Sequence, residues 1–178
     1  VSIDQLIYEE FIRSVPVETA FAEIGFTGLP GTAVLELDPH AALTLSDLRM
    51  GVPAAECGKR TSFTKIDESV LAAEFSGYMG FLDSALSALP HGRSFLKRFT
   101  NDTGSLFVCP AGYIAILVTF EFRIGGVEEM MNLCLPYPVI EPLIGLLSTD
   151  HLLSSLQKKT GRRCSADFDV DANIAVKG

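Results

Sequence analysis

The clearest pattern of apolar and polar positions lies between residues 113 and 124. Every second position carries an apolar side chain, namely Ile114, Ile116, Val118, Phe120, Phe122 and Ile124. The intervening positions are apolar at first and become polar after residue 117. This pattern predicts a strand that is covered on both faces at one end and solvated on one face at the other. A partner strand over residues 127–135 follows Gly125-Gly126, a pair typical of a hairpin turn.

The rest of the chain alternates between helical and strand-like patterns. Apolar side chains at helical spacing predict helices over residues 2–15, 40–50, 64–89 and 138–147. Shorter runs bounded by turn residues predict strands over residues 20–26 and 32–37. Residues 51–62 are rich in small residues and are interrupted by Pro53 and Gly58, which predicts a loop.

The helix over residues 64–89 has a well-defined start. Thr64 is expected to be its N-cap, with Asp67 in the position of the usual capping-box glutamate. A broad apolar stripe is expected to form its buried face and includes Ile66, Val70, Leu71, Phe75, Met79 and Phe81. The segment Pro90-His91-Gly92 is expected to end it.

Helices precede and follow a pair of strands in each half of the chain. We therefore predict an α/β fold in which one sheet lies between helical layers, built from a pseudo-duplicated αββα unit. Residues 1–157 are expected to form one domain. Residues 158–178 are basic at first and then alternate with period two. We interpret them as a linker and the start of a truncated further domain.

Composition and charge exclude several classes of partner. The chain has 178 residues, of which 48% are hydrophobic, a high share for a soluble monomer. This predicts either a well-covered sheet or apolar surface hidden against partners. A net charge of −8 argues against nucleic-acid binding and against adhesion to an anionic membrane. The most apolar run, residues 106–120, is too short and too interrupted to insert into a membrane.

The four cysteines and three histidines do not suggest a metal or cofactor site. Cys57, Cys109, Cys134 and Cys164 form no C-x-x-C pair, and the histidines are scattered. Cys109 and Cys134 lie in apolar runs and are expected to act as small buried hydrophobes. Reduced thiols in a cytoplasmic protein are the expected state.

Four segments, in order, resemble one known family. They are residues 8–16 (YEEFIRSVP), 63–67 (FTKID), 118–121 (VTFE) and 125–142 (GGVEEMMNLCLPYPVIEP). Each resembles a segment in the middle domain of the FliM family of flagellar motor switch proteins. The resemblance implies a three-layer α/β/α CheC-like domain with a pseudo-twofold internal repeat. It also implies a non-enzymatic scaffold in the cytoplasmic ring of the flagellar basal body, peripheral to the inner membrane.

The same resemblance implies a set of protein partners. The middle domain of the rotor protein FliG and neighbouring FliM copies are expected to bind this domain directly. FliN and phosphorylated CheY are expected to bind through regions outside this chain. The implied role is to relay chemotaxis signals into the direction of rotation.

In the family, the FliG contact centres on a G-G-x-G loop between the short and the long helix. The matching place here reads Gly51-Val52-Pro53-Ala54, so only the first glycine is kept. Either the loop docks through Met50, Val52 and Pro53, or the interface has diverged. Without the resemblance, a plain surface connection is the expected interpretation. The resemblance implies a FliG-binding site at Arg49, Met50, Gly51, Val52, Pro53, Ala54 and Arg60.

The alternative within this fold is a CheC-type phosphatase acting on phosphorylated CheY. Such enzymes need a helix-borne Glu with an Asn three residues later, which orients the attacking water. Glu74 is followed at that spacing by Gly77. The pair Glu129 and Asn132 has the spacing but lies in a predicted strand, which would put the two side chains on opposite faces. No Ser-His-Asp arrangement is indicated either, so we predict no catalytic residue.

Overall fold

A computed structural model describes residues 1–90 and 92–144, which fall within one compact unit. Its sheet contains the strands β1 (Ser2–Ile7), β2 (Ala20–Phe26), β3 (Thr32–Leu37), β4 (Ser94–Thr100), β5 (Ile114–Ile124) and β6 (Val127–Pro136). Its helices are α1 (Tyr8–Ser14), α2 (Pro39–Arg49), α3 (Lys65–Ala85) and α4 (Tyr137–Ile144), with short 3₁₀ turns at Ala54–Glu56 and Thr103–Ser105. The expected domain boundary at residue 157 lies outside the described residues.

The six strands follow the order β1-β5-β6-β3-β2-β4, and every neighbouring pair is antiparallel. This order is symmetric about the central β6–β3 pair, with the hairpins β5-β6 and β2-β3 on either side. The outer strands are exchanged between the halves of the chain. β1 comes from the first half and pairs with β5, whereas β4 comes from the second half and pairs with β2. The predicted pseudo-twofold repeat is therefore visible in the sheet.

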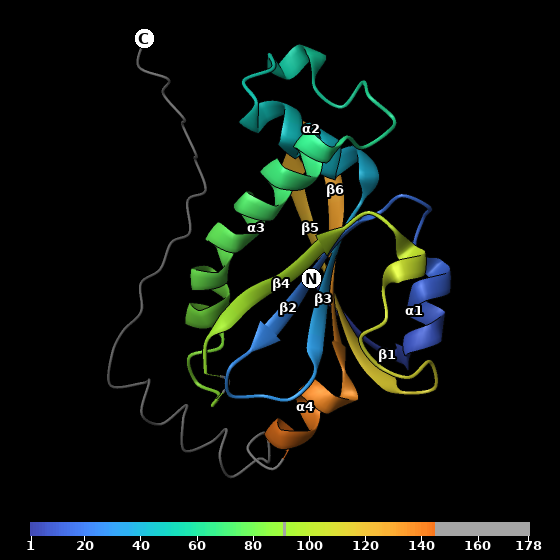
Figure 1. Ribbon diagram of the computed structural model, residues 1–178, viewed down its shortest axis with the longest axis vertical. Helices are drawn as coiled ribbons and strands as arrows, with labels where there is room; N and C mark the ends of the chain where they lie inside the picture. Colours follow the sequence, from blue (N-terminus) through green and yellow to red (C-terminus); the bar gives the residue numbers. More distant parts are fainter. Residues whose placement is uncertain (91, 145–178) are drawn as a thin grey trace. The chain divides into compact units, whose positions relative to one another are not determined.

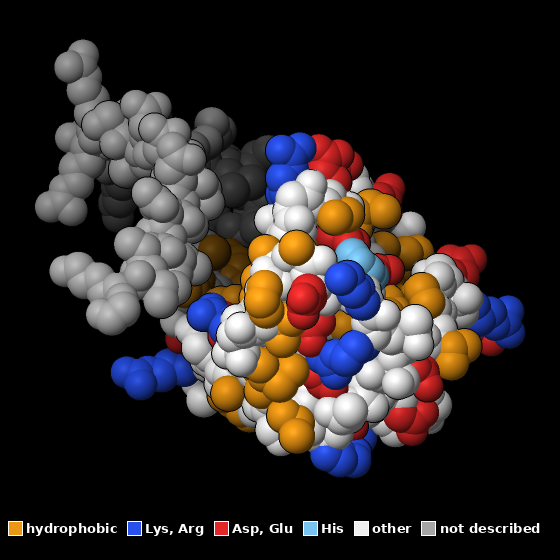
Figure 2. All heavy atoms as spheres, turned by 90° about the horizontal axis from the view of Figure 1, so that it is seen from above, with side chains coloured by type: hydrophobic (Ala, Val, Ile, Leu, Met, Phe, Trp, Pro, Cys, Tyr) orange, Lys and Arg blue, Asp and Glu red, His pale blue; other side chains and the backbone are white. Residues whose placement is uncertain are grey.

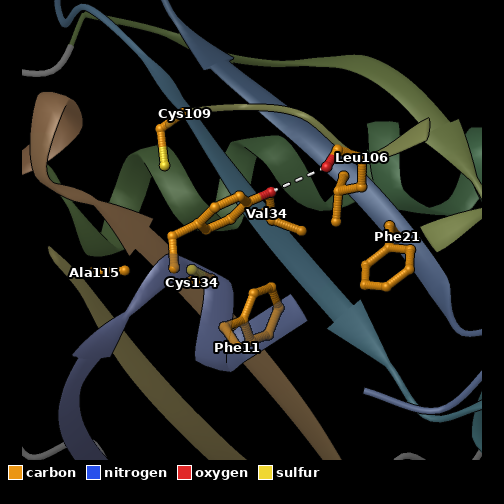
Figure 3. Close-up of a cluster of buried hydrophobic side chains, with 8 residues drawn as sticks. Phe11, Phe21, Val34, Leu106, Cys109, Ala115 and Cys134 are labelled. Atoms are coloured by element: carbon orange, nitrogen blue, oxygen red, sulfur yellow. Dashed lines mark hydrogen bonds between the residues drawn. The ribbon is translucent and has the colours of Figure 1, made fainter. Parts of the chain in front are cut away.

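One face of the sheet packs against α1 and the connection between β4 and β5. Buried side chains from four strands and both covering segments meet there (Figure 3): Tyr8, Phe11, Phe21, Val34, Leu106, Cys109, Ala115 and Cys134. The Tyr8 hydroxyl donates a hydrogen bond of 3.4 Å to the Leu106 carbonyl. Burial raises the pKa of the Cys109 thiol to about 11 and that of Cys134 to about 12. Both therefore stay protonated and pack as small hydrophobes, as predicted.

The opposite face packs against α2 and α3 (Figure 1). Small side chains on both surfaces bring these helices close to the sheet: Ala20 and Ala22 on β2, and Ala41 and Ala42 on α2. Phe75 of α3 stacks on Phe99 of β4 with ring centroids 5.9 Å apart. The sheet thus lies between helical layers, which confirms the predicted three-layer α/β/α fold.

The predicted helix over residues 2–15 is wrong in its first half. Residues 2–7 form β1, and the helix begins only at Tyr8, where the Glu10 carboxylate accepts a hydrogen bond of 3.1 Å from the Ile7 amide. The apolar positions Ile3, Leu6 and Ile7 fit helical spacing. Pairing with β5 places Ile3 and Ile7 on one face of the sheet and turns Leu6 toward α1. A pairing partner more than a hundred residues away overrides the local pattern.

The predicted buried face of α3 was too wide. Leu71, Phe75 and Met79 are buried as expected, but Ile66 and Phe81 are 65% and 74% exposed. A helix that packs on one sheet buries a single narrow stripe, and these two side chains lie outside it. The helix also ends at Ala85 rather than at residue 89.

Strand β4 was not predicted because its sequence, SFLKRFT, carries two charged residues.

Candidate functional site

The candidate loop, residues 51–62, follows α2. A single glycine at the start of the loop ends that helix. Gly51 has a φ of +83°, and its amide donates to the Leu48 carbonyl at 3.1 Å. The next amide, that of Val52, reaches back to the Asp47 carbonyl at 2.9 Å. This pair of bonds is a Schellman cap, which favours glycine at the left-handed position. The retained glycine therefore has a structural role at the helix end.

Val52 and Ala54 stand where the G-G-x-G pattern has its other two glycines, and these replacements do not strain the loop. Among the described residues, positive φ angles occur at Glu18 and at six glycines, and none falls on Val52, Pro53 or Ala54. Proline at 53 leads into the 3₁₀ turn Ala54–Glu56. The backbone of this loop therefore suits the residues that stand in it.

Replacing Gly51 with alanine is expected to destabilise the protein by about 1 kcal/mol, because an L side chain is disfavoured at positive φ. No atom lies within 4 Å of the added Cβ, so the effect comes from the backbone alone. Gly77 is the matched control, since it lies inside α3 with equally open surroundings. Gly77→Ala is expected to stabilise by about 0.5–1 kcal/mol. Chemical denaturation measures both changes, and equal signs would contradict the cap assignment.

Arg60 holds the far end of the loop against both helices. Its guanidinium donates to Asp47 of α2, with Nη2 to Oδ1 at 2.6 Å and Nε to Oδ1 at 3.0 Å. It also donates to Asp67 of α3, with Nη1 to Oδ2 at 2.9 Å and Nη2 to Oδ1 at 2.7 Å. The second Asp47 oxygen accepts the Gly58 amide at 3.0 Å. Two carboxylates from different helices are thus joined through one side chain of the loop.

Asp67 is the centre of this cluster and is fully buried. Its carboxylate accepts the Thr64 amide at 2.8 Å and the Ser46 hydroxyl at 2.7 Å, and the Asp67 amide donates to the Thr64 hydroxyl at 3.3 Å. The predicted capping pair of Thr64 and Asp67 is therefore confirmed. Hydrogen bonds from Arg60, and then from Ser46 and Thr64, hold the pKa of Asp67 well below its usual range. The ion pairs raise the pKa of Arg60.

Arg49, at the end of α2, is tied to α3 in a similar way. Its guanidinium pairs with Glu74, which also accepts a hydrogen bond from the Tyr78 hydroxyl. The hydrogen bond from Arg49 to Glu74 raises the pKa of Arg49. The two arginines of the candidate site thus hold α2, the loop and α3 together, and their charges are already paired inside the molecule.

An open hollow of about 460 Å³ lies beside the loop. Its lining consists of Asp47, Met50, Val52, Glu56, Lys59, Arg60, Thr64 and Ile66. Met50 is 42% exposed, and Ile66, on the first turn of α3, is 65% exposed. Figure 2 looks down on this end of the molecule, where hydrophobic side chains lie among acidic and basic ones. Apolar side chains held at an exposed rim are typical of a protein-binding surface.

The structure brings Met50, Val52 and Arg60 together around this hollow, while Pro53 and Ala54 lie on the exposed outer part of the loop. Ile66 is the member that sequence reasoning missed, because its apolar side chain was assigned to the buried stripe. The exposure of Ile66 could have been inferred from the predicted capping pair of Thr64 and Asp67. Since Asp67 points inward as the cap, its neighbour Ile66 must turn by about 100° away from the core.

Comparison with known proteins now gives the family. A family model described as "Flagellar motor switch protein FliM" matches residues 1–152. The chain belongs to the FliM family. FliM from Treponema pallidum is 32% identical over 182 residues, which cover 97% of this chain and 53% of the relative. FliM from Borreliella burgdorferi is 36% identical over 149 residues, covering 83% and 42%. The chain thus spans about half the length of these curated FliM relatives.

Solved FliM structures share the fold. The FliM chain of a FliM–SpeE complex from H. pylori superposes with a TM-score of 0.74 at 27% identity, covering 84% of this chain and 78% of that one. The H. pylori FliM middle domain gives a TM-score of 0.71 at 26% identity, covering 82% and 78%. A FliG–FliM complex from H. pylori shares the fold at 24% identity with a TM-score of 0.70, covering 82% and 80%. The resemblance stated from the four segments is confirmed.

The residues considered for a CheC-type phosphatase do not form such a site in this FliM-family chain. Glu129 points toward α2, where its Oε1 lies 2.6 Å from His40 Nδ1. Asn132 lies on the other face of β6, where its amide donates to Glu36 at 2.5 Å and accepts from Thr119 at 2.6 Å. The predicted opposite orientation is confirmed. Glu74, the other candidate, is engaged by Arg49 and Tyr78.

Two further observations concern the described part of the FliM-family chain. Within residues 1–90 and 92–144, no group of three or more His, Cys, Asp or Glu side chains is placed to hold a metal ion. No helix in those ranges is both long enough and apolar enough to cross a bilayer.

Proposed function

We propose that this chain serves as the middle domain of a flagellar motor switch protein and binds the middle domain of FliG through the loop that follows α2. The observation that carries the proposal is the apolar rim of Met50, Val52 and Ile66, in which Met50 and Ile66 are exposed and Val52 is half-buried, beside the Arg60 cluster. The H. pylori FliG–FliM complex, which shares this fold, supports the choice of partner.

The proposed mechanism is rigid transmission through paired charges. Arg60 fixes the loop to α2 and α3, and Arg49 fixes α2 to α3, so a tilt of the domain moves the loop without deforming it. A signal received elsewhere in the longer protein then changes how the loop presents its rim to FliG. Such a switch needs two arrangements separated by only a few kcal/mol.

The remaining assignments are proposals of the same kind. Neighbouring FliM copies are proposed to pack beside this domain. FliN and phosphorylated CheY are proposed to bind regions outside the chain. The domain is proposed to end near residue 157, with residues 158–178 as a linker into a further domain. The proposed location is the cytoplasmic side of the inner membrane, in the basal body.

Calorimetric titration with the FliG middle domain from the same organism tests this function. Saturable binding with one partner per domain is the expected result. No heat change at high micromolar concentrations, with the domain folded by circular dichroism, would refute direct docking through this surface. Adding the domain to phosphorylated CheY is expected to leave its decay rate unchanged, and acceleration would favour the phosphatase instead.

A further inference from the structure

Two charged side chains beside the candidate loop have no partner in the described part of the molecule. The charged residues that line the hollow next to the loop are Asp47, Glu56, Lys59 and Arg60. Asp47 and Arg60 are paired with each other. Glu56 and Lys59 are exposed, and neither side chain makes a hydrogen bond or an ion pair with residues 1–90 or 92–144. The hollow therefore presents one unpaired negative charge and one unpaired positive charge beside its apolar rim.

The backbone that carries Lys59 is fixed on both sides. The Gly58 amide donates to a carboxylate of α2 at 3.0 Å, and Gly58 has a φ of +70°. A Cβ atom at this glycine would lie 2.5 Å from Thr44 Oγ1 and 2.7 Å from His40 Nε2, so the chain packs directly against α2 here. On the other side, Arg60 is bound to carboxylates of α2 and α3. Lys59 therefore stands between two anchored neighbours.

The backbone at Glu56 is held by the 3₁₀ turn that it ends. Its amide donates to the Pro53 carbonyl at 2.8 Å. The next side chain, the Cys57 thiol, donates to the carbonyls of Val52 at 3.5 Å and Pro53 at 3.4 Å. Glu56 and Lys59 are not paired with each other, although only two residues separate them in the chain. A backbone that is already fixed loses little freedom when a partner binds, which favours the use of these charges in recognition.

We propose that Lys59 and Glu56 determine the orientation in which FliG docks, by pairing with an acidic and a basic side chain on either side of its apolar anchor. This inference rests on the proposed function and adds the chemistry of the partner at the same site. The apolar rim supplies contact area but little direction, because apolar attraction is non-directional. Two opposite charges at separate positions do distinguish two directions, since a reversed segment would bring like charges together.

The test exchanges the two charges in a double variant, Glu56→Lys with Lys59→Glu. The exchange keeps the net charge of −8 and leaves the apolar rim unchanged. Because both side chains are exposed, the melting temperature should stay within about 2 °C of the natural protein. The calorimetric affinity for the FliG middle domain is expected to fall by about 30-fold or more, since each attraction becomes a like-charge contact.

A neutral double variant, Glu56→Gln with Lys59→Gln, removes the attraction without adding repulsion. Its affinity should fall by only about three- to tenfold. The matched control exchanges an exposed acid–base pair on α1, Glu9→Arg with Arg13→Glu, and also keeps the net charge. Helix α1 packs on the opposite face of the sheet from α2 and α3, so this exchange is expected to leave the affinity unchanged. An equal loss in the α1 control would overturn the inference.

Salt separates charge pairing from a change in loop structure. Exposed charges are screened by salt, so the difference in affinity between the natural and the exchanged protein should narrow by about threefold or more between about 0.05 M and about 0.5 M NaCl. A difference that does not vary with salt would overturn this inference while leaving FliG docking in place. Equal affinities of the two proteins would do the same. No FliG binding by the natural protein would instead overturn the proposed function, and this inference with it.

Discussion

Replacing Asp67 with asparagine is expected to lower the free energy of unfolding by about 3 kcal/mol, the scale of breaking a buried ion pair from one side. Asp67 is fully buried and accepts hydrogen bonds from Arg60, Ser46 and Thr64. Asparagine keeps the shape but removes the charge that Arg60 neutralises. The melting temperature should fall by roughly 6–12 °C for a domain of this size. Differential scanning calorimetry measures the change.

Glu68→Gln is the matched control, one position further along the same helix. Glu68 pairs with Lys65 at 2.9 Å, and the lysine side chain is 90% exposed. Exposed pairs of this kind contribute about 0.5 kcal/mol or less. The control is therefore expected to melt within about 2 °C of the natural protein. If the two substitutions had similar effects, the Arg60 cluster would not have the stabilising role assigned to it.

The same cluster predicts a dependence on pH. Because the folded state lowers the pKa of Asp67, the unfolded chain binds the proton more readily than the folded one. The stabilisation is therefore complete above the unfolded pKa of about 4 and is lost progressively as the pH falls below it. The difference in stability between the natural protein and Asp67→Asn should shrink in acid. A constant difference from pH 7 to pH 2.5 would show that the charge is not responsible.

The substitution Met50→Asp is expected to weaken FliG binding by about 30-fold or more, provided the proposed interface is correct. A carboxylate at the apolar rim must be desolvated against the partner, which costs free energy. Arg60 and Arg49, the two arginines of the candidate site, are already paired with Asp47, Asp67 and Glu74. Met50 is partly exposed and follows the last turn of α2, so its replacement should leave the melting temperature within about 2 °C.

Phe81→Asp is the control for this experiment. Phe81 is 74% exposed on α3 and lies fifteen residues beyond Ile66, about 22 Å along the helix axis. Its substitution is expected to leave the calorimetric affinity for FliG unchanged. Unchanged binding by Met50→Asp would move the interface away from this hollow. Loss of FliG binding with both substitutions would indicate that the partner contacts the whole length of α3.

The elements that were predicted correctly are those whose signals are local. β5, β6 and their glycine turn follow from strict alternation, and the Thr64–Asp67 cap follows from a spacing of three residues. β1 was misassigned because a three-and-four spacing of apolar residues fits a helix, while its strand partner lies far away in the chain. β4 was missed because its charges are satisfied across the sheet, where Lys97 contacts Thr32 and Arg98 contacts Glu23.

The candidate site likewise has a part that could be predicted from the sequence and a part that could not. Its position after α2 was inferred from a resemblance, and the glycine kept there, Gly51, adopts the positive φ that ends the helix. The role of Arg60 could not be predicted, because its two carboxylate partners lie on different helices, 13 and 7 residues away. Only the packing of α2 beside α3 brings those carboxylates to one point. Sequence reasoning therefore located the loop but not what holds it.

The exchange of outer strands has a consequence for how the domain folds. β1 pairs with β5, and β2 pairs with β4, so neither half of the chain can complete its own three-stranded layer. The β1–β5 pairing joins residues about a hundred positions apart, and the β2–β4 pairing joins residues about seventy-five positions apart. These separations raise the contact order and slow folding. The halves cannot unfold one at a time without leaving a strand unpaired. A single cooperative unfolding transition is therefore expected, with no stable intermediate in which only one half of the sheet is folded.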